Sequence, residues 1–170
     1  MLSVLFLSIS FFYGNAQNYP KHAIVLEAAG IGSYGSLSYE RIFFEKKSIR
    51  LSASAGLSTL GLVDFNDKFN PDVIIPIKGM FLWNWRTHHL VIGIGQTFSS
   101  FPRIERPTLE TKRRNTISGS PLLGYRWQNP EKRFFIQLTY SPIWEQYQRW
   151  QQWGGIGFGF SLKRKNRNEN

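Results

Sequence analysis

The residue types that carry out acid–base and nucleophilic chemistry are sparse in this chain. Its 170 residues include three histidines, His22, His88 and His89, and no cysteine. The lack of cysteine excludes disulfides, thiol catalysis and cysteine-ligated metal centres. A serine nucleophile would need a histidine as its base and a carboxylate to orient that histidine. Whether such a group forms depends on where the surrounding elements place the three rings.

One short segment is rich in oxygen ligands. It contains Asp64, Asn66, Asp67, Asn70 and Asp72. Closely spaced carboxylates and amides could bind Ca²⁺, but the residue order of an EF-hand loop and its closing glutamate are missing. Asn and Asp also favour turns through their own side-chain hydrogen bonds. We therefore expect a polar loop here, and the sequence predicts no metal site and no cofactor.

The chain begins like an exported protein. Residues 1–13 form an apolar run that is too short to span a bilayer, and Gly14-Asn15-Ala16 follows with small residues at the two positions that a signal peptidase reads. We predict a signal peptide over residues 1–16, cleaved after Ala16. A buried N-terminal strand or helix is the alternative.

The rest of the chain alternates apolar and other residues with a period of two, which indicates β-strands. Eight such segments cover 22–30, 36–44, 48–57, 72–83, 88–98, 115–127, 133–143 and 153–162. One face of the segments is bulky and apolar, whereas the other is small, as in Ser52-x-Ser54-x-Gly56. A bulky wall around a narrow polar lumen is typical of small barrels in lipid. We predict an all-β fold, an eight-stranded antiparallel up-and-down transmembrane β-barrel over residues 17–162.

Connection lengths support this prediction. If the connections between consecutive segments are counted along the chain, the even-numbered ones are short: 45–47, 84–87 and 128–132. Three of the odd-numbered ones are long: 58–71, 99–114 and 144–152. Bacterial outer-membrane barrels have short periplasmic turns and long outer loops. We therefore expect both chain termini in the periplasm. A soluble lipocalin-like barrel that binds a small apolar ligand is an alternative, because period-two alternation fits either architecture.

Several strand segments resemble a known family. Residues 22–27, 35–41 (GSLSYER), 88–95 (HHLVIGIG), 124–127 (GYRW) and 134–142 resemble the small eight-stranded outer-membrane β-barrel proteins common in Bacteroidetes. The last strand resembles the assembly signal of such barrels, although a basic tail, residues 163–170, follows it here. The resemblance implies a Gram-negative cell envelope location and the barrel fold, but no activity.

Strand parity directs five charged side chains into the barrel. They are Glu27, Glu40, Arg50, Lys78 and Arg126. Because isolated charges are costly inside a protein, we hypothesise a paired network that fills the lumen and leaves no diffusion pore. For Arg50 and Arg126, which lie close to their turns, a hydrated position at the rim is an equal alternative.

A second group of cations lies in the third outer connection. It comprises Arg103, Arg106, Lys112, Arg113 and Arg114. Arg and Lys pair well with phosphate, so we hypothesise contacts with lipopolysaccharide phosphates; a solvated basic loop is the alternative. The net charge of +10 would also suit nucleic acid, but an exported barrel does not meet it, so we expect none.

Together these patterns predict a non-enzymatic outer-membrane protein. Its expected role is structural or surface interaction: envelope integrity, adhesion, or a subunit of an envelope complex with protein partners. The runner-up is a lipid A-modifying acylase or deacylase in the outer leaflet. That chemistry needs histidine near the outer loops, whereas all three histidines fall at predicted periplasmic strand ends.

Overall fold

The computed structural model describes residues 19–63, 68–105, 110–145 and 148–162. The predicted signal peptide and the basic tail therefore lie outside the described residues. The elements in chain order are β1 (His22–Ala29), the 3-10 turn η1 (Gly30–Gly32), β2 (Gly35–Lys46), β3 (Ile49–Ser58), β4 (Val73–Trp85), β5 (His88–Glu105), β6 (Glu110–Gln128), β7 (Phe134–Tyr140), β8 (Ile143–Glu145), β9 (Gln148–Gln151) and β10 (Gly154–Leu162). No helix within these ranges is long and apolar enough to cross a membrane.

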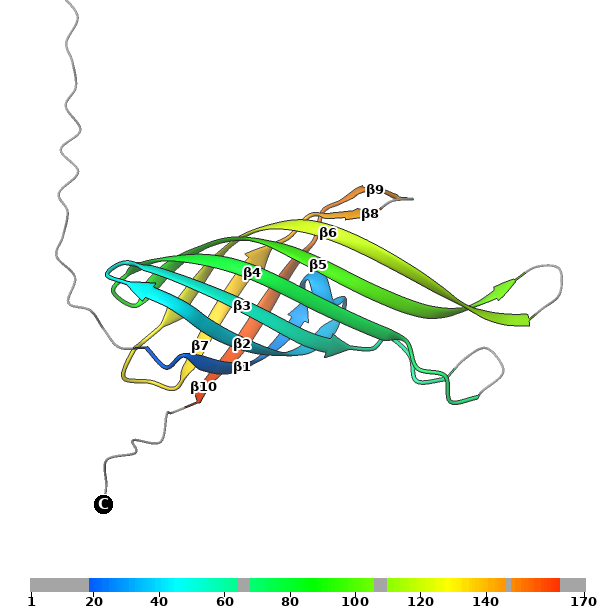
Figure 1. Cartoon of the computed structure of the whole chain (residues 1–170), viewed down its shortest axis with the longest axis horizontal. Helices are drawn as coiled ribbons and strands as arrows, with labels where there is room; N and C mark the ends of the chain where they lie inside the picture. The colour runs from blue at the N-terminus through cyan, green and yellow to red at the C-terminus, as the bar shows by residue number, and fades with distance from the viewer. Residues whose placement is uncertain (1–18, 64–67, 106–109, 146–147, 163–170) are drawn as a thin grey trace, which may run out of the picture.

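The strands form a closed antiparallel barrel (Figure 1). β1 pairs with β2 on one side and with β10 on the other, and the remaining long strands follow in order until β5 pairs with β6. Eight strands, β1 to β7 and β10, make up the wall, and each corresponds to one of the eight segments that alternate in sequence. The predicted eight-stranded antiparallel up-and-down barrel is therefore confirmed.

The two ends of the barrel differ in their connections. At one end, which we call the turn end, lie the short connections β2–β3, β4–β5 and β6–β7, the start of β1 and the end of β10. At the other, the hairpin end, lie η1, the β3–β4 connection, the far ends of β5 and β6, and the β8–β9 hairpin (Figure 1). The alternation of short and long connections predicted from the sequence is present in the structure.

The third outer connection is not the loop that was expected over 99–114. β4 pairs with β5 only as far as Ser100, whereas β5 and β6 continue to pair with each other up to Glu105 and Glu110. The pair therefore projects beyond the wall as a two-stranded ribbon of five residues per strand, roughly 17 Å long at strand geometry. β8 pairs with β6 at Ser118 and Gly119, so the fourth outer connection, between β7 and β10, also contains strand structure.

The wall has the polarity that was predicted. Ile92, Leu138 and Phe158 face outward with 48%, 51% and 52% of their surface exposed, whereas Thr139 and Gly157 on the opposite strand face are buried. A large apolar surface on the outside of a barrel is the arrangement of transmembrane barrels, because lipid replaces the missing core on that side.

The interior is less polar than expected. Besides serines and glycines, it contains a cluster made of Ile31, Met80, Leu82, Val91 and Leu122, and a second cluster made of Ala23, Val25 and Phe135. Apart from Ile31, which lies in η1, these residues occur in strand runs that are apolar on both faces, so alternation did not reveal them. The ring of Phe135 occupies the space where a side chain at Gly159 would lie, which explains why this strand position carries glycine.

Candidate functional site: the filled barrel interior

The structure buries all five charged residues that strand parity directs inward. Arg50 and Arg126 are 0% and 1% exposed, so neither occupies the hydrated rim position that was the alternative. Glu27, Glu40 and Lys78 are likewise buried, at 3%, 2% and 5% exposure. The five do not form one continuous network, however. They divide into two ion pairs and one cation with neutral partners.

The first ion pair joins Arg126 on β6 to Glu40 on β2. Arg126 Nη1 and Nη2 donate to the two carboxylate oxygens of Glu40 at 2.9 and 2.7 Å. Arg126 Nε donates to Gln137 Oε1 at 2.7 Å, and the guanidinium lies 4.2 Å from the centre of the Phe135 ring. This two-pronged geometry is the strongest form of an arginine–carboxylate contact, and it leaves few donors of Arg126 without a partner.

The second ion pair lies nearer the hairpin end. Lys78 Nζ on β4 donates to Glu27 Oε2 on β1 at 2.6 Å. Thr139 Oγ1 on β7 donates to the other oxygen of Glu27 at 3.5 Å. Both ion pairs therefore connect strands that are not neighbours in the wall, and each neutralises a charge that could not remain alone in the interior.

Arg50 has neutral partners and closes the turn end with Tyr19. Its Nε donates to Asn84 Oδ1 at 3.1 Å and its Nη1 to Gln128 Oε1 at 3.2 Å. The ring of Tyr19 lies 3.9 Å from the Arg50 guanidinium, and the Tyr19 hydroxyl donates to the carbonyl oxygen of Arg86 at 2.9 Å. Tyr19 precedes β1 and is 6% exposed, and burial raises the pKa of its hydroxyl above 10.0. Tyr19 therefore closes the barrel interior at the turn end, and we call a residue that closes one end in this way a cork.

The hairpin end is closed by η1, which folds into the barrel. Ile31 is 4% exposed and packs in the interior cluster with Met80. Thr97 Oγ1 donates to the Ile31 carbonyl at 2.8 Å, and Trp153 Nε1 donates to the Gly30 carbonyl at 2.6 Å. A side chain at Gly95 would overlap Cδ1 of Ile31, so glycine there makes room for the inserted turn. Ile31 thus forms a second cork.

Sequence reasoning missed both corks. Ile31 falls between the segments predicted over 22–30 and 36–44 and was given no role, and neither was Tyr19. For Ile31 the sequence did carry a signal, namely a single apolar residue between two glycines in a connection, which indicates burial. For Tyr19 the only signal is its position two residues before the first strand, and that does not indicate which side it faces.

The three histidines lie at the turn end, as the sequence predicted. His22 and His88 face outward and contact the hydroxyls of Tyr39 and Tyr125, whereas His89 faces inward and contacts the main-chain carbonyl of Gln128. Within the described part of the chain, none of the three contacts a serine hydroxyl or a carboxylate. The geometry for acyl transfer is therefore not assembled around them.

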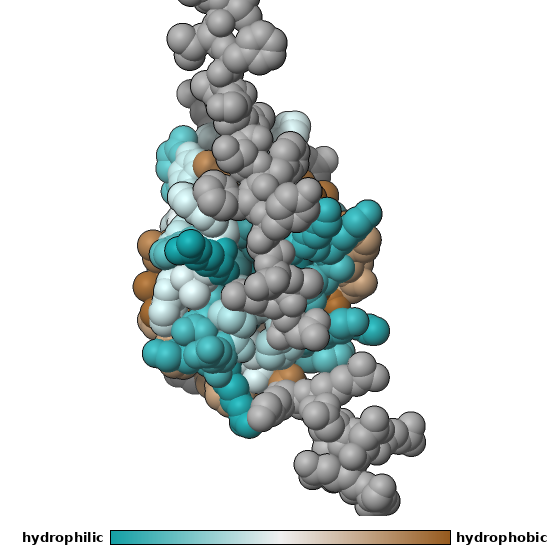
Figure 2. Space-filling model, turned by 90° about the vertical axis from the view of Figure 1, so that its left-hand side faces the viewer, coloured by the Kyte–Doolittle hydropathy of each residue, from teal (hydrophilic) through white to brown (hydrophobic). Residues whose placement is uncertain are grey.

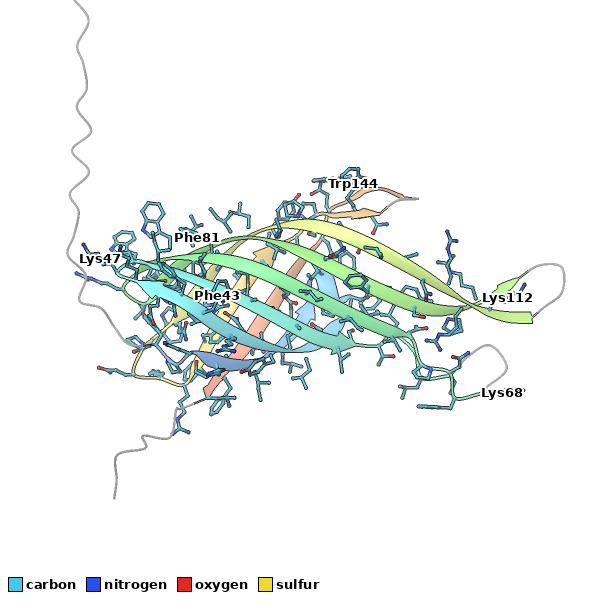
Figure 3. All side chains as sticks on the ribbon, in the orientation of Figure 1. Phe43, Lys47, Lys68, Phe81, Lys112 and Trp144 are labelled. Atoms are coloured by element: carbon cyan, nitrogen blue, oxygen red, sulfur yellow. The ribbon has the colours of Figure 1, made fainter. Side chains whose placement is uncertain are left out.

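The cations of the third outer connection lie on the projecting ribbon. Arg103 on β5 and Lys112 on β6 are directly opposite each other, and both are exposed; Figure 3 shows Lys112 on the ribbon, at the end opposite to Lys47. Arg114 is also exposed, directly opposite Phe101. Arg106 lies outside the described residues.

Arg113 has a different position, because it fastens the ribbon to the β3–β4 connection. It donates to the side chain of Asn70 and to the carbonyl oxygen of Pro71, the latter at 2.8 Å. It also donates to the hydroxyl of Ser100 at 3.1 Å. Its guanidinium is therefore engaged within the protein.

The oxygen-rich segment lies partly outside the described residues, which do not include Asp64, Asn66 and Asp67. Asn70 accepts a hydrogen bond from Arg113, and the main-chain N–H of Asp72 donates to the carbonyl of Gly61 at 2.9 Å. Across the described ranges, no group of three or more His, Asp and Glu side chains is placed to hold a metal ion.

Comparison with known proteins agrees with the fold. No family model matches the sequence, and no curated protein matches it. Among solved structures, the chain is similar to the N-terminal β-barrel domain of Pseudomonas aeruginosa OprF, with a TM-score of 0.55 at 11% identity, covering 82% of this chain and 93% of that one. The Yersinia pestis outer membrane protein Ail, solved in a phospholipid bilayer nanodisc, also matches, with a TM-score of 0.45 at 11% identity, covering 84% of this chain and 99% of that one.

Proposed function

We propose that this chain is an exported, non-enzymatic outer-membrane barrel with a structural or surface-interaction role. In this proposal a signal peptide over residues 1–16 directs export, the turn end and both termini face the periplasm, and the hairpin end faces outward. The observation that carries the proposal is the inverted polarity of the barrel: an apolar wall surrounds an interior that two ion pairs and two corks fill. Such a barrel suits a bilayer and serves poorly as a channel.

Membrane location is tested by expression of the full chain in a Gram-negative host. We expect the protein in the outer-membrane fraction, resistant to carbonate extraction, with Gln17 as its first residue by mass spectrometry. Recovery in the soluble periplasm would overturn the location and favour the soluble barrel. An intact N-terminus in the membrane fraction would overturn cleavage after Ala16.

The closed lumen is tested by electrical recording. Purified barrel in planar bilayers is expected to give no steady channel current, because Ile31, Lys78–Glu27, Arg126–Glu40 and Tyr19 occupy successive levels from the hairpin end to the turn end. Variants that lack one cork are expected to remain closed, since the ion pairs lie behind it. Steady open-channel current from the unaltered protein would contradict a filled interior.

Surface interaction is assigned to the ribbon, through its cations and the phosphates of lipopolysaccharide. Arg103 and Lys112 are directly opposite each other and both are exposed, so the two cations lie side by side on one face of the ribbon. A phosphate that contacts this face would supply acceptor oxygens to both. Arg113 supports the site by holding the ribbon against the β3–β4 connection.

The phosphate contact is tested with lipopolysaccharide and with the same molecule after removal of its phosphates. Arg103→Gln with Lys112→Gln is expected to weaken binding of the phosphorylated form by roughly tenfold or more, since a charge-assisted hydrogen bond contributes about 1.5–3 kcal/mol. Lys68→Gln, an exposed cation on the β3–β4 connection outside the ribbon, is the matched control and should bind normally. Equal binding of both forms by the unaltered protein would overturn this assignment.

A further inference from the structure

Two histidine–tyrosine pairs with the same geometry lie on the outer wall. Nδ1 of His22 on β1 contacts the hydroxyl of Tyr39 on β2, with ring centres 5.9 Å apart and planes 29° apart. Nδ1 of His88 on β5 contacts the hydroxyl of Tyr125 on β6, with ring centres 5.9 Å apart and planes 33° apart. In each pair the histidine opens one strand of a hairpin and the tyrosine lies diagonally across on the next strand.

The pairs occupy equivalent places on opposite sides of the barrel. Four strand steps around the closed sheet separate β1 from β5, and β2 from β6. Tyr39 and Tyr125 are 47% and 43% exposed, and both histidines lie closer to the turn end than their tyrosines. Exposed Trp85 is directly opposite His88, and exposed Trp83 lies two residues further along β4, opposite Leu90. Aromatic residues at such a level mark the boundary between hydrocarbon and headgroups.

Each pair has a cation next to it. Arg41 is directly opposite His22 in the β1–β2 register and is exposed on the same outer face. Trp127 is directly opposite His88 in the β5–β6 register, and the ammonium of Lys132 lies 5.9 Å from its ring centre. Both pairs therefore combine a tyrosine in the hydrocarbon region, a histidine at the boundary and a cation at the boundary or just beyond it.

The whole rim at the turn end is basic. Among the described residues it exposes the cations Lys21, Arg41, Lys46, Lys47, Arg86, Lys132 and Arg133, whereas its acidic residues are Glu45 and Glu131. In Figure 2, which looks at the turn end, hydrophilic residues occupy much of the visible coloured surface, and hydrophobic ones lie mainly along its outline. A ring of cations directly beside an apolar wall places positive charge at the depth of lipid phosphates.

We infer that the turn end binds the headgroups of anionic phospholipids, with one site at each histidine–tyrosine pair. This inference rests on the proposed membrane insertion. A tyrosine hydroxyl facing hydrocarbon needs a partner, and Nδ1 of the histidine supplies it. The second ring nitrogen, Nε2, then remains for a phosphate oxygen, and Arg41 or Lys132 balances the phosphate charge.

A lipid fits these sites better than a soluble anion does. The phosphate of a phospholipid remains attached to acyl chains, and the apolar wall that begins at Ile24 and Leu90 would contact those chains. A soluble polyanion would gain the charge contact alone. The two sites also predict a stoichiometry, namely two tightly held anionic lipids for each barrel.

The experiment compares phosphatidylglycerol with phosphatidylcholine. The folded barrel is placed in vesicles of phosphatidylcholine alone and in vesicles that also contain phosphatidylglycerol, and resistance to trypsin reports insertion. Quenching of tryptophan fluorescence by a brominated form of either lipid then gives the relative affinity, with Trp83, Trp85 and Trp127 as reporters at the turn end. We expect stronger quenching by brominated phosphatidylglycerol, and a smaller difference at 1 M salt.

Variants locate the effect. Arg41→Gln and Lys132→Gln are each expected to reduce the preference for phosphatidylglycerol by about fivefold at one of the two sites. Lys68→Gln, an exposed cation on the β3–β4 connection at the hairpin end, is the matched control and should retain the preference. His22→Phe with His88→Phe keeps aromatic rings but removes the ring nitrogens, and should also reduce it.

The outcomes separate this inference from the proposed function. Insertion into both vesicle types with equal quenching by the two lipids would overturn the lipid sites and leave the membrane barrel intact. An equal loss of preference in the hairpin-end control would likewise overturn them, because the charge would then act without regard to position. Failure to insert into either vesicle would remove both proposals.

Discussion

Arg126 on β6 and Glu40 on β2 join opposite walls of the barrel through two hydrogen bonds of 2.9 and 2.7 Å. The two strands are four steps apart in either direction around the closed sheet. The pair is therefore a strut across the interior, which holds two walls that share no main-chain hydrogen bonds.

Removal of one partner of this strut should be strongly destabilising. Glu40→Gln leaves the guanidinium of Arg126 buried without a counter-charge, which typically costs about 3–5 kcal/mol. Urea titration of the barrel in lipid vesicles, with tryptophan fluorescence as the signal, measures the free energy of unfolding. Replacement of both residues by methionine should cost less than Glu40→Gln alone. Glu131→Gln, on the exposed rim, should change the free energy by no more than about 0.5 kcal/mol.

The inserted turn predicts a compensating pair of substitutions. Gly95→Val places methyl groups where Cδ1 of Ile31 lies, and such overpacking typically costs about 1–3 kcal/mol. Ile31→Ala alone should also destabilise, by about 2–5 kcal/mol. The double variant should lose less than the sum of the two, because each change relieves the other, and the same titration measures it. Gly119→Val, which meets no atom within 4 Å, is the matched control. Additive losses would contradict the contact.

Membrane insertion predicts a depth-dependent cost for charge on the outer wall. Ile94 is 73% exposed and pairs with Gly79 at the middle of β4. Ile94→Arg should therefore destabilise the barrel in a bilayer by about 2–4 kcal/mol, whereas Phe43→Arg near the turn end should cost about 0–1 kcal/mol. Unfolding in vesicles measures both. Equal costs at the two depths would argue against a wall in contact with lipid.

Tyr19 predicts a specific loss of stability in alkali. Burial raises the pKa of its hydroxyl above 10.0, so the folded state retains this proton to a higher pH than the unfolded chain does. Its contribution is complete below about pH 10 and declines as the pH rises towards the pKa of the folded state. The free energy of unfolding should therefore decrease more steeply above pH 10 for the unaltered protein than for Tyr19→Phe. Because the other tyrosines are common to both proteins, parallel curves would show that Tyr19 does not titrate differently on folding.

Alternation predicted the wall because the wall has two unlike faces. Successive residues in a segment such as 22–30 face alternately outward and into the interior, so burial of one face imposes the period that the sequence shows. The same parity correctly directed Glu27 and Lys78 inward. It could not reveal which charges pair, because the partners lie on strands that are not neighbours, and the stagger of the closed barrel decides which side chains meet.

The ribbon was missed for a related reason. On the ribbon, Arg103, Lys112 and Arg114 are exposed, so no buried face imposes an apolar period there, and Pro102 is typical of a loop. Cross-strand hydrogen bonds and the contacts of Arg113 hold the ribbon instead. Such contacts depend on the fold around them and leave no pattern in the local sequence.

The strut between β2 and β6 also bears on the order of assembly. In an open, flat sheet, Glu40 and Arg126 would lie four strands apart and could not reach each other. Each charge would then lack its counter-ion. The stabilisation from this ion pair is therefore gained only when the edge strands β1 and β10 pair and close the barrel. Closure is thus coupled to neutralisation, so in the proposed membrane location a half-formed sheet would keep these charges in polar surroundings until the cylinder closes.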